Sequence, residues 1–166
     1  MMIEMKVAGL TLDPLTNTPI IILKDLDDRR AIPIWIGLYE ATAIATEMEH
    51  IAFTRPMTHD LIKDILHILE VLVEKVEIID IRNNTFFANI HLSKGGRNIV
   101  VDSRPSDAIA LALRVDVPIF VDEKVIDKSR NVDFGLKGEE LDKFKKEQLK
   151  EFLENLSAED FGKYKM

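Results

Sequence analysis

The sequence predicts an α+β fold, a single compact domain of antiparallel β meanders packed with helices, plus a C-terminal amphipathic helix. Three observations predict this class. Hydrophobic residues make up 46% of the 166 residues and charged residues 31%, a balance typical of a globular protein with a substantial core. Short β-branched runs separated by turn residues occur in two groups, within residues 2–36 and within residues 71–101. Segments with the helical spacing of apolar residues follow each group.

The first meander is expected to contain three strands. Residues 2–12 alternate in part between apolar and polar side chains, which indicates a strand with one face in water. Residues 18–23 are apolar and β-branched, which indicates a strand buried on both faces. Residues 31–36 form the third strand. Its Pro33 cannot donate a ladder hydrogen bond, so we expect that strand at an edge or a bulge.

Two helices are expected between the meanders, from residue 38 to about 50 and from residue 58 to about 72. The apolar residues expected to form their buried stripes are Ala41, Ile44, Ala45 and Met48 in the first helix and Leu61, Ile62, Ile65, Leu66, Leu69 and Leu72 in the second. Residues 51–57 form a linker that contains Arg55-Pro56.

The second meander is expected over residues 71–81, 86–92 and 98–101, with turns at residues 82–85 and 94–97. The chain then enters a helix at Arg104-Pro105, because proline is tolerated in the first helical turn and disfavours helix at the residue before it. This helix is expected to end near Val115.

After the third helix we expect one more strand at residues 118–121 and a loop over 122–134 with one helical turn at 123–126.

The C-terminal part is expected to form a helical extension over residues 137–166, separate from an α+β domain over residues 1–136. The charged segment 139–155 follows Gly138 and indicates an amphipathic helix that docks on the domain or on a partner subunit. Its apolar stripe is Leu141, Phe144, Leu149, Phe152, Leu153 and Leu156.

Bulk properties exclude several classes of protein. The chain has no cysteine, so disulfides, thiolate metal sites and cysteine nucleophiles are excluded, and we expect a reducing cytoplasm. No apolar run is long enough for a membrane span, and no secretory signal is expected. The net charge of −7 argues against broad electrostatic capture of nucleic acid. Residues 82–114, however, hold five basic and two acidic residues, which hints at an anionic ligand or is a chance fluctuation.

Two polar turns share one pattern. Arg55-Pro56 and Arg104-Pro105 are each followed by a hydroxyl residue, an aspartate and an apolar helix. An arginine beside a helix N-terminus can bind phosphate, and aspartates there can hold a divalent cation through oxygen ligands. Alternatively, Arg104 pairs with Asp102 or Asp60 and only supports two helix starts. Spacing alone leaves both interpretations open.

The segments Ile32–Gly37, Glu40-Ala41, Arg55–Leu61 and Asp102–Ala112, in this order and at these distances, resemble the bifunctional nuclease domain family over residues 3–127. The resemblance implies a compact α+β domain and a nuclease that acts on both RNA and DNA. It also implies a small cytoplasmic protein for which a homo-oligomer is expected. The roles of individual residues rest on their chemistry.

The working hypothesis is metal-assisted hydrolysis of phosphodiesters. Asp102 and Asp107 would hold a divalent ion such as Mg²⁺ or Mn²⁺, with Glu40 or Asp60 as a further ligand. His59 would act as general base or acid, because histidine titrates near neutral pH.

The same hypothesis gives the neighbouring polar residues two further roles. Arg55 and Arg104 would bind phosphate. Thr58 and either Ser103 or Ser106 would cap the two helices and orient the carboxylates.

A different class of function is a non-enzymatic binding domain. It would use the same cleft for a small anionic ligand, or the C-terminal helix for a protein partner. The negative net charge and the lack of a basic stripe interleaved with aromatics favour this alternative.

Overall fold

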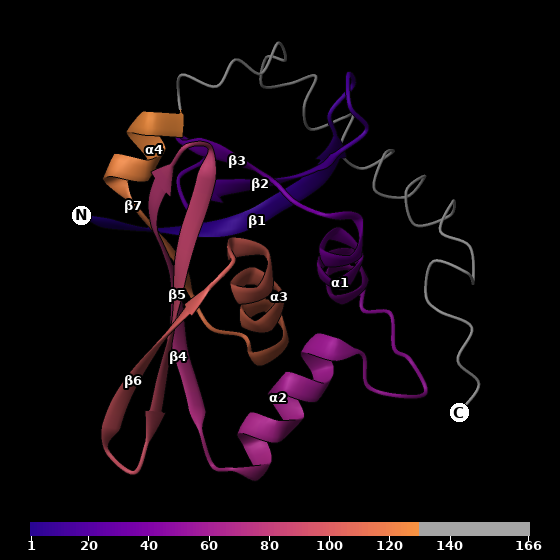
Figure 1. The fold of residues 1–166 in the computed structure, drawn as a ribbon, viewed down its shortest axis with the longest axis vertical. Helices are drawn as coiled ribbons and strands as arrows, with labels where there is room; N and C mark the ends of the chain where they lie inside the picture. The colour runs from indigo at the N-terminus through magenta and orange to yellow at the C-terminus, as the bar shows by residue number, and fades with distance from the viewer. Residues whose placement is uncertain (130–166) are drawn as a thin grey trace.

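A strand outside both predicted meanders joins them into one sheet. The computed structural model describes residues 1–129, in which seven strands and four helices form an α+β fold, as predicted (Figure 1). The strands are β1 (Met2–Leu12), β2 (Pro19–Asp25), β3 (Ala31–Trp35), β4 (Leu72–Arg82), β5 (Thr85–Lys94), β6 (Arg97–Ser103) and β7 (Ile119–Asp122). Their order in the sheet is β3-β2-β1-β7-β4-β5-β6.

The joining strand is β7. It pairs antiparallel with β1, where Met2 lies opposite Asp122, and parallel with β4, where Ile78 lies opposite Val121. Every other pairing in the described sheet is antiparallel, as expected for two meanders. Pro33 lies in β3, an edge strand of this sheet, which confirms the prediction made for it.

The helices are α1 (Leu38–Met48), α2 (Thr58–Ile68), α3 (Pro105–Val115) and α4 (Glu123–Ser129). Helix α3 packs on β4 and β5, and both α1 and α2 pack against α3, with α1 also touching β2. Figure 1 shows these three helices on the same side of strands β4–β6. Helix α4 packs on β3, β4 and β7, and it replaces the single helical turn that was expected. Among the described residues, no helix has both the length and the apolar character needed to span a bilayer.

The core lies between the sheet and α1, α3 and α4. It is built from aliphatic side chains of strands and helices that are fully buried, which accounts for most of the stabilisation by apolar burial. These include Ile21, Leu23, Ile32, Ile34, Ile44, Val76, Ile78, Ile109, Val121, Val125 and Ile126. Helix α3 is the central element, since six consecutive residues from Ser106 to Leu111 include five that are buried.

The prediction for α2 was wrong in one respect. Leu61, Ile62, Ile65, Leu69 and Leu72, expected in its buried stripe, are all exposed, while the polar His59 is buried. The physical reason is that α2 packs on α3 through the side of the helix that carries His59 and the half-buried Leu66, which is about 110° around the helix axis from the centre of the apolar stripe. The amphipathic pattern was read correctly, but its apolar side faces outward.

The predicted C-terminal helix at 139–155 and the boundary between residues 136 and 137 lie outside the described residues.

Candidate functional site

Three helix N-termini supply the candidate site. Each of these helices carries a carboxylate at its third residue, namely Glu40 in α1, Asp60 in α2 and Asp107 in α3. Acidic side chains are favoured there because the first backbone N–H groups of a helix give it a partial positive charge. Packing of α1 and α2 on α3 brings these carboxylates into one region.

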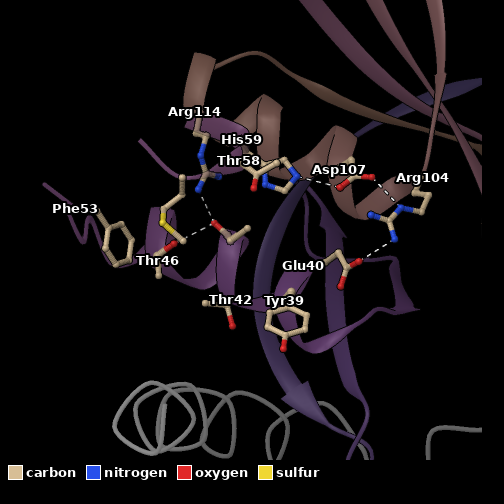
Figure 2. Close-up of a pocket in the computed structure, with 12 residues that line it drawn as sticks. Tyr39, Glu40, Thr42, Thr46, Phe53, Thr58, His59, Arg104, Asp107 and Arg114 are labelled. Carbon is tan, nitrogen blue, oxygen red and sulfur yellow. Dashed lines mark hydrogen bonds and ion pairs between the residues drawn. The ribbon is translucent and has the colours of Figure 1, made fainter. Parts of the chain in front are cut away.

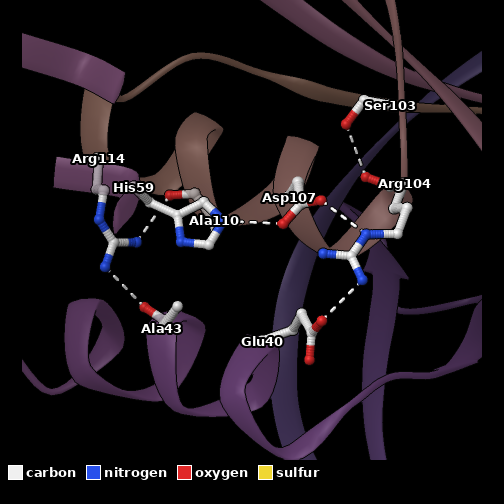
Figure 3. A network of polar contacts seen from close by, with 8 residues as sticks. All are labelled: Glu40, Ala43, His59, Ser103, Arg104, Asp107, Ala110 and Arg114. Atoms are coloured by element: carbon white, nitrogen blue, oxygen red, sulfur yellow. Dashed lines mark hydrogen bonds and ion pairs between the residues drawn. The ribbon is translucent and has the colours of Figure 1, made fainter. Parts of the chain in front are cut away.

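A continuous chain of polar contacts links α1, α3 and α2 (Figure 3). Arg104 donates from Nη1 to Oε1 of Glu40 and from Nε to Oδ2 of Asp107, both at 2.8 Å. The other carboxylate oxygen of Asp107, Oδ1, lies 3.0 Å from Nε2 of His59. Asp107 therefore stands between a guanidinium and an imidazole and contacts each through a different oxygen.

These contacts stabilise the charged forms of Asp107 and Arg104. Burial by itself raises the pKa of Asp107, but the hydrogen bonds from Arg104 and His59 outweigh it, so its pKa lies below the ordinary 3.8. The hydrogen bond and charge of Asp107, followed by those of Glu40, raise the pKa of Arg104. Asp107 is therefore a carboxylate at neutral pH, and its Oδ1 can accept a hydrogen bond from a protonated ring nitrogen of His59.

His59 presents its second ring nitrogen to a cavity. The residue is only 8% exposed, and Nδ1 has no hydrogen-bond partner among the described residues. No fully buried side-chain nitrogen or oxygen in the described part of the chain lacks a partner, so Nδ1 must be accessible. Since His59 lines the cavity, Nδ1 can act there as a proton acceptor whenever Nε2 carries its proton toward Asp107.

The cavity holds about 330 Å³ and lies among α1, α2 and α3 (Figure 2). Its lining residues are Tyr39, Glu40, Thr42, Ala43, Thr46, Phe53, Met57, Thr58, His59, Arg104, Asp107 and Arg114. Tyr39 and Phe53 line it while remaining 75% and 37% exposed, which places two aromatic rings at its rim. Neither ring is among the site residues predicted from the sequence.

A second network, around Arg114, fixes the helices to each other. The Arg114 side chain is only 3% exposed and donates from Nε to Asp60 (2.7 Å) and from Nη2 to the carbonyl of Ala43 in α1 (2.9 Å). Its Nη1 donates to the carbonyl of Ala110 in its own helix. Arg114 is not among the residues predicted from the sequence, although its lone charge at the end of the apolar run 108–113 was a signal for it.

Asp60 belongs to this second network. Its Oδ2 accepts from the backbone N–H of Met57, and its Oδ1 accepts from Arg114. Burial raises the pKa of Asp60, but these hydrogen bonds lower it further than burial raises it. Asp60 is outside the set of residues that line the cavity. The contact with Met57 stabilises the first turn of α2, and the contact with Arg114 holds α2 to α3.

The capping predictions are corrected. The residue at the N-cap of α2 is Met57, with Thr58 inside the helix, and the residue at the N-cap of α3 is Arg104. Ser103 donates its hydroxyl to the carbonyl of Arg104, and Ser106 is buried at the second position of α3. In α3 the Arg-Pro sequence explains the shift, because Pro105 takes the first helical position and leaves Arg104 before it as the cap.

Besides Asp60, Ser103 and Ser106, two further predicted site residues, Asp102 and Arg55, are outside the cavity lining. Asp102 is exposed in β6 opposite Asn89 of β5, and side chains alternate between the faces of a strand. The helices cover the face that carries Ala88 and Ile90, so Asp102 is on the other face. Arg55 is exposed in the linker before α2 and does not line the cavity.

The described residues do not fit a divalent metal. Asp102 and Asp107, the predicted ligand pair, lie on different faces of the sheet. Both oxygens of Asp107 and one of Glu40 already accept hydrogen bonds from side chains, and Arg104 places a positive charge between the two carboxylates. In the part of the chain that the structure describes, no three histidine, aspartate or glutamate side chains are grouped as metal ligands.

Comparison with known proteins places the chain in a family. A model of the bifunctional nuclease domain matches residues 21–133. An uncharacterised protein of Mycobacterium tuberculosis is 37% identical over 95% of this chain and 97% of its own length. Bifunctional nuclease 2 of Arabidopsis thaliana is 29% identical over 63% of this chain, and bifunctional nuclease 1 of Oryza sativa is 26% identical over 57%. The matched regions are 33% and 29% of those two plant proteins. The chain therefore belongs to the bifunctional nuclease domain family.

Proposed function

We propose that the protein hydrolyses phosphodiester bonds of RNA and DNA in the cavity among α1, α2 and α3. The observation that carries this proposal is the chain of contacts from Glu40 through Arg104 and Asp107 to His59 along that cavity. Membership of the family, and the similarity to plant proteins named bifunctional nucleases, support it.

His59 is the proposed general base. Asp107 accepts a hydrogen bond from Nε2 of His59, which carries the ring proton. This contact fixes the tautomer of His59 and leaves the lone pair of Nδ1 facing the cavity. Nδ1 takes a proton from a water molecule as the water oxygen forms its bond to phosphorus. The bond from phosphorus to the leaving oxygen then breaks, and this oxygen takes a proton from solvent. The negative charge of Asp107 stabilises the imidazolium that results.

Arg104 is the proposed phosphate-binding residue. Its Nε and Nη1 are held by Asp107 and Glu40, while Nη2 has no hydrogen-bond partner among the described residues. Its side chain is 65% exposed, so an incoming phosphate can reach that nitrogen. A guanidinium held in place by two carboxylates needs little reorganisation to stabilise the charge that develops on the phosphoryl oxygens.

The rim supports a nucleic acid as substrate. Tyr39 and Phe53 both line the cavity and expose part of their rings. Stacking of a base on an aromatic ring stabilises single-stranded nucleic acid by about 1–3 kcal/mol per base and depends little on sequence. Such contacts would suit an enzyme that accepts both RNA and DNA, because both nucleic acids present the same kind of base face.

A second candidate is a binding domain for a small anionic ligand. The observation that favours it is that Asp107 has both oxygens engaged by Arg104 and His59, as a structural ion pair would. In this case Nη2 of Arg104, which has no hydrogen-bond partner among the described residues, and the imidazole of His59 would hold the anion in the same cavity without cleaving it.

The predictions about metal dependence, location in the cell and assembly stay proposals. They are divalent-metal assistance, a cytoplasmic location and assembly into a homo-oligomer. Because the described carboxylates do not fit a metal site, metal dependence is a measured variable in the test and no step of the mechanism depends on it.

The test is cleavage of end-labelled single-stranded RNA and DNA by wild type, His59→Gln and Arg104→Gln. Each protein is assayed with Mg²⁺, with Mn²⁺ and with a chelator. His91→Gln is the matched control, because His91 also faces a carboxylate, Glu77 at 2.7 Å, but lies outside the cavity.

We expect His59→Gln to lose at least a hundredfold in cleavage rate, as is usual for a general base, with His91→Gln unchanged. Equal trace rates in all four proteins would reject the nuclease and indicate contamination. Anion binding that Arg104→Gln abolishes, without cleavage by wild type, would favour the second candidate.

A further inference from the structure

The outward side of α2 is apolar. Leu61, Ile62, Ile65, Ile68 and Leu69 form a stripe along it, and all five are exposed, Ile68 to 76%. Successive residues of an α-helix are about 100° apart, so the centre of this stripe lies about 110° around the helix from the side that carries His59 and Leu66 and packs on α3. Isolated exposed leucines are ordinary on a protein surface, but a complete apolar helix side in contact with water is not.

The end of the sheet near α2 is also apolar and uncovered. Strand β6 is an edge strand, and Ile99 and Val101 are 43% and 41% exposed. They lie opposite Leu92 and Ile90 of β5, and Ile90 packs against the core on the side of α3. Leu92 in turn lies opposite Val73 of β4, and β4 begins at Leu72, four residues after α2 ends, so this end of the sheet lies beside the C-terminal end of α2 (Figure 1).

The exposed area suits a stable interface. The α2–β6 surface consists of Leu61, Ile62, Ile65, Ile68, Leu69, Leu72, Ile99 and Val101. Their exposed fractions amount to roughly 700 Å², close to the approximately 800 Å² that each partner contributes to a standard protein interface. A monomer rarely leaves so much apolar surface in water.

The sequence of α2 indicates what covers this surface. Its apolar stripe reads the same in both directions about Ile65, with Ile62 matching Ile68 and Leu61 matching Leu69. Two copies of such a helix, packed antiparallel about a two-fold axis through Ile65, place leucine against leucine and isoleucine against isoleucine. In a two-fold interface each residue contacts the residue at the mirrored position of the partner, so here side chains of the same size meet along the whole stripe.

We propose that a second copy of this chain covers the α2–β6 surface, with the two α2 helices packed antiparallel and Ile65 on the two-fold axis. The proposal does not depend on the proposed nuclease function. It bears on the site nonetheless, because α2 carries His59 and, within the described chain, packs mainly on α3. A partner copy would hold the outer side of the helix whose start forms part of the cavity.

A cross-link tests the position of the axis. The chain has no cysteine, so Ile65→Cys introduces one thiol per copy. The two thiols would meet at the axis, and mild oxidation or a short bismaleimide should convert the full-length protein to a covalent dimer within minutes. The matched control is Leu15→Cys, because Leu15 is 93% exposed in the turn between β1 and β2 and should cross-link far more slowly.

Light scattering after size exclusion tests the assembly itself. Wild type should give about twice the chain mass of 18.9 kDa, Ile65→Asp should give a single chain, and Leu15→Asp should match wild type. Ile65 is 45% exposed, so the aspartate variant should still fold, with an unchanged circular dichroism spectrum. A monomeric wild type, or a dimer that Ile65→Asp leaves intact, would overturn the proposal. A monomer that Ile65→Asp destabilises would instead indicate that the chain's own C-terminal segment covers α2.

Discussion

Nε2 of His59 lies 3.0 Å from Oδ1 of Asp107, although 48 positions separate the two residues in the sequence. The contact joins the second residue of α2 to the third residue of α3. It forms only when both helices are docked, so the candidate site depends on the packing of α2 against α3 and not on either polar turn alone.

The first prediction concerns the pH dependence of stability. The pKa of Asp107 is lower in the folded protein than its ordinary value of 3.8, so the folded state favours the carboxylate. This stabilisation is present above pH 3.8 and is lost as the pH falls through the folded pKa. Asp107→Asn should therefore be less stable than wild type at pH 7, by about 1 kcal/mol for a partly exposed pair. Once the pH has fallen below this folded pKa, the free energies of unfolding of the two proteins should approach each other.

Urea unfolding at a series of pH values measures this difference. The control is Asp116→Asn, which removes a carboxylate with no contact to the His59 network and should leave the pH profile of wild type unchanged. A constant difference between wild type and Asp107→Asn across the acid range would show that the contacts do not stabilise the charged form.

The second prediction uses Gly37, the N-cap residue of α1. A Cβ atom at this position would overlap the Glu40 carboxylate, which must then move away from Arg104. The backbone of Gly37 is in an ordinary extended conformation, so Gly37→Ala should cost no more than about 1 kcal/mol. Cleavage should fall by the same factor in Gly37→Ala and in Glu40→Gln.

The double variant distinguishes this account from a general disturbance of α1. If alanine acts only by displacing Glu40, Gly37→Ala combined with Glu40→Gln should be no slower than either single variant. Multiplicative losses would mean that Gly37 affects the site by another route.

The third prediction concerns Arg114, which links the three helices. Arg114→Met would leave the charge of Asp60 with only one backbone N–H donor and would remove the contact with Ala43. Loss of one partner from a buried ion pair lowers the free energy of unfolding by about 3–5 kcal/mol. Because Asp60 is partly exposed, we expect Arg114→Met to lower it by about 3 kcal/mol.

Arg82→Met is the control for burial. Arg82 donates to Asp80 at the same 2.7 Å, but its side chain is 64% exposed. Exposed ion pairs contribute about 1 kcal/mol or less, so its unfolding midpoint should change little. Similar losses in the two variants would contradict the role given to burial.

The fourth prediction tests the placement of Asp102. Since this residue lies on the sheet face away from the helices, Asp102→Asn should cleave RNA and DNA at the wild-type rate. Asp107→Asn should lose at least tenfold, because the amide no longer orients His59 as a carboxylate does. Equal losses of cleavage rate in the two variants would show that Asp102 and Asp107 belong to the same site.

Part of this site could be predicted from the sequence. The repeated pattern of Arg-Pro, hydroxyl and aspartate indicated two similar helix starts, and the structure places His59 and Asp107 from these turns in contact. It also brings Arg104 and Glu40 into the same chain of contacts. Such patterns are local, and a local pattern is sufficient to mark a helix start.

The rest depended on information that no local pattern contains. Side chains alternate between the two faces of a strand, so the face on which Asp102 lies depends on the exact register of β6. A change of register by one residue would move Asp102 to the other face. The partners of Arg114 come from three helices, so their meeting follows from tertiary packing. The stripe of α2 was recognised as amphipathic, but the sequence does not state whether an apolar side faces its own core or another chain.

The most direct test of the central claim is chemical rescue of His59→Ala by imidazole. Removing the side chain extends the cavity beside Asp107, and free imidazole can then occupy the place of the missing ring. We expect His59→Ala to lose cleavage of RNA and DNA and to regain part of it in proportion to added imidazole. The regained rate should rise with pH as imidazole loses its proton. Wild-type cleavage by His59→Ala without imidazole would contradict the claim that His59 moves the proton.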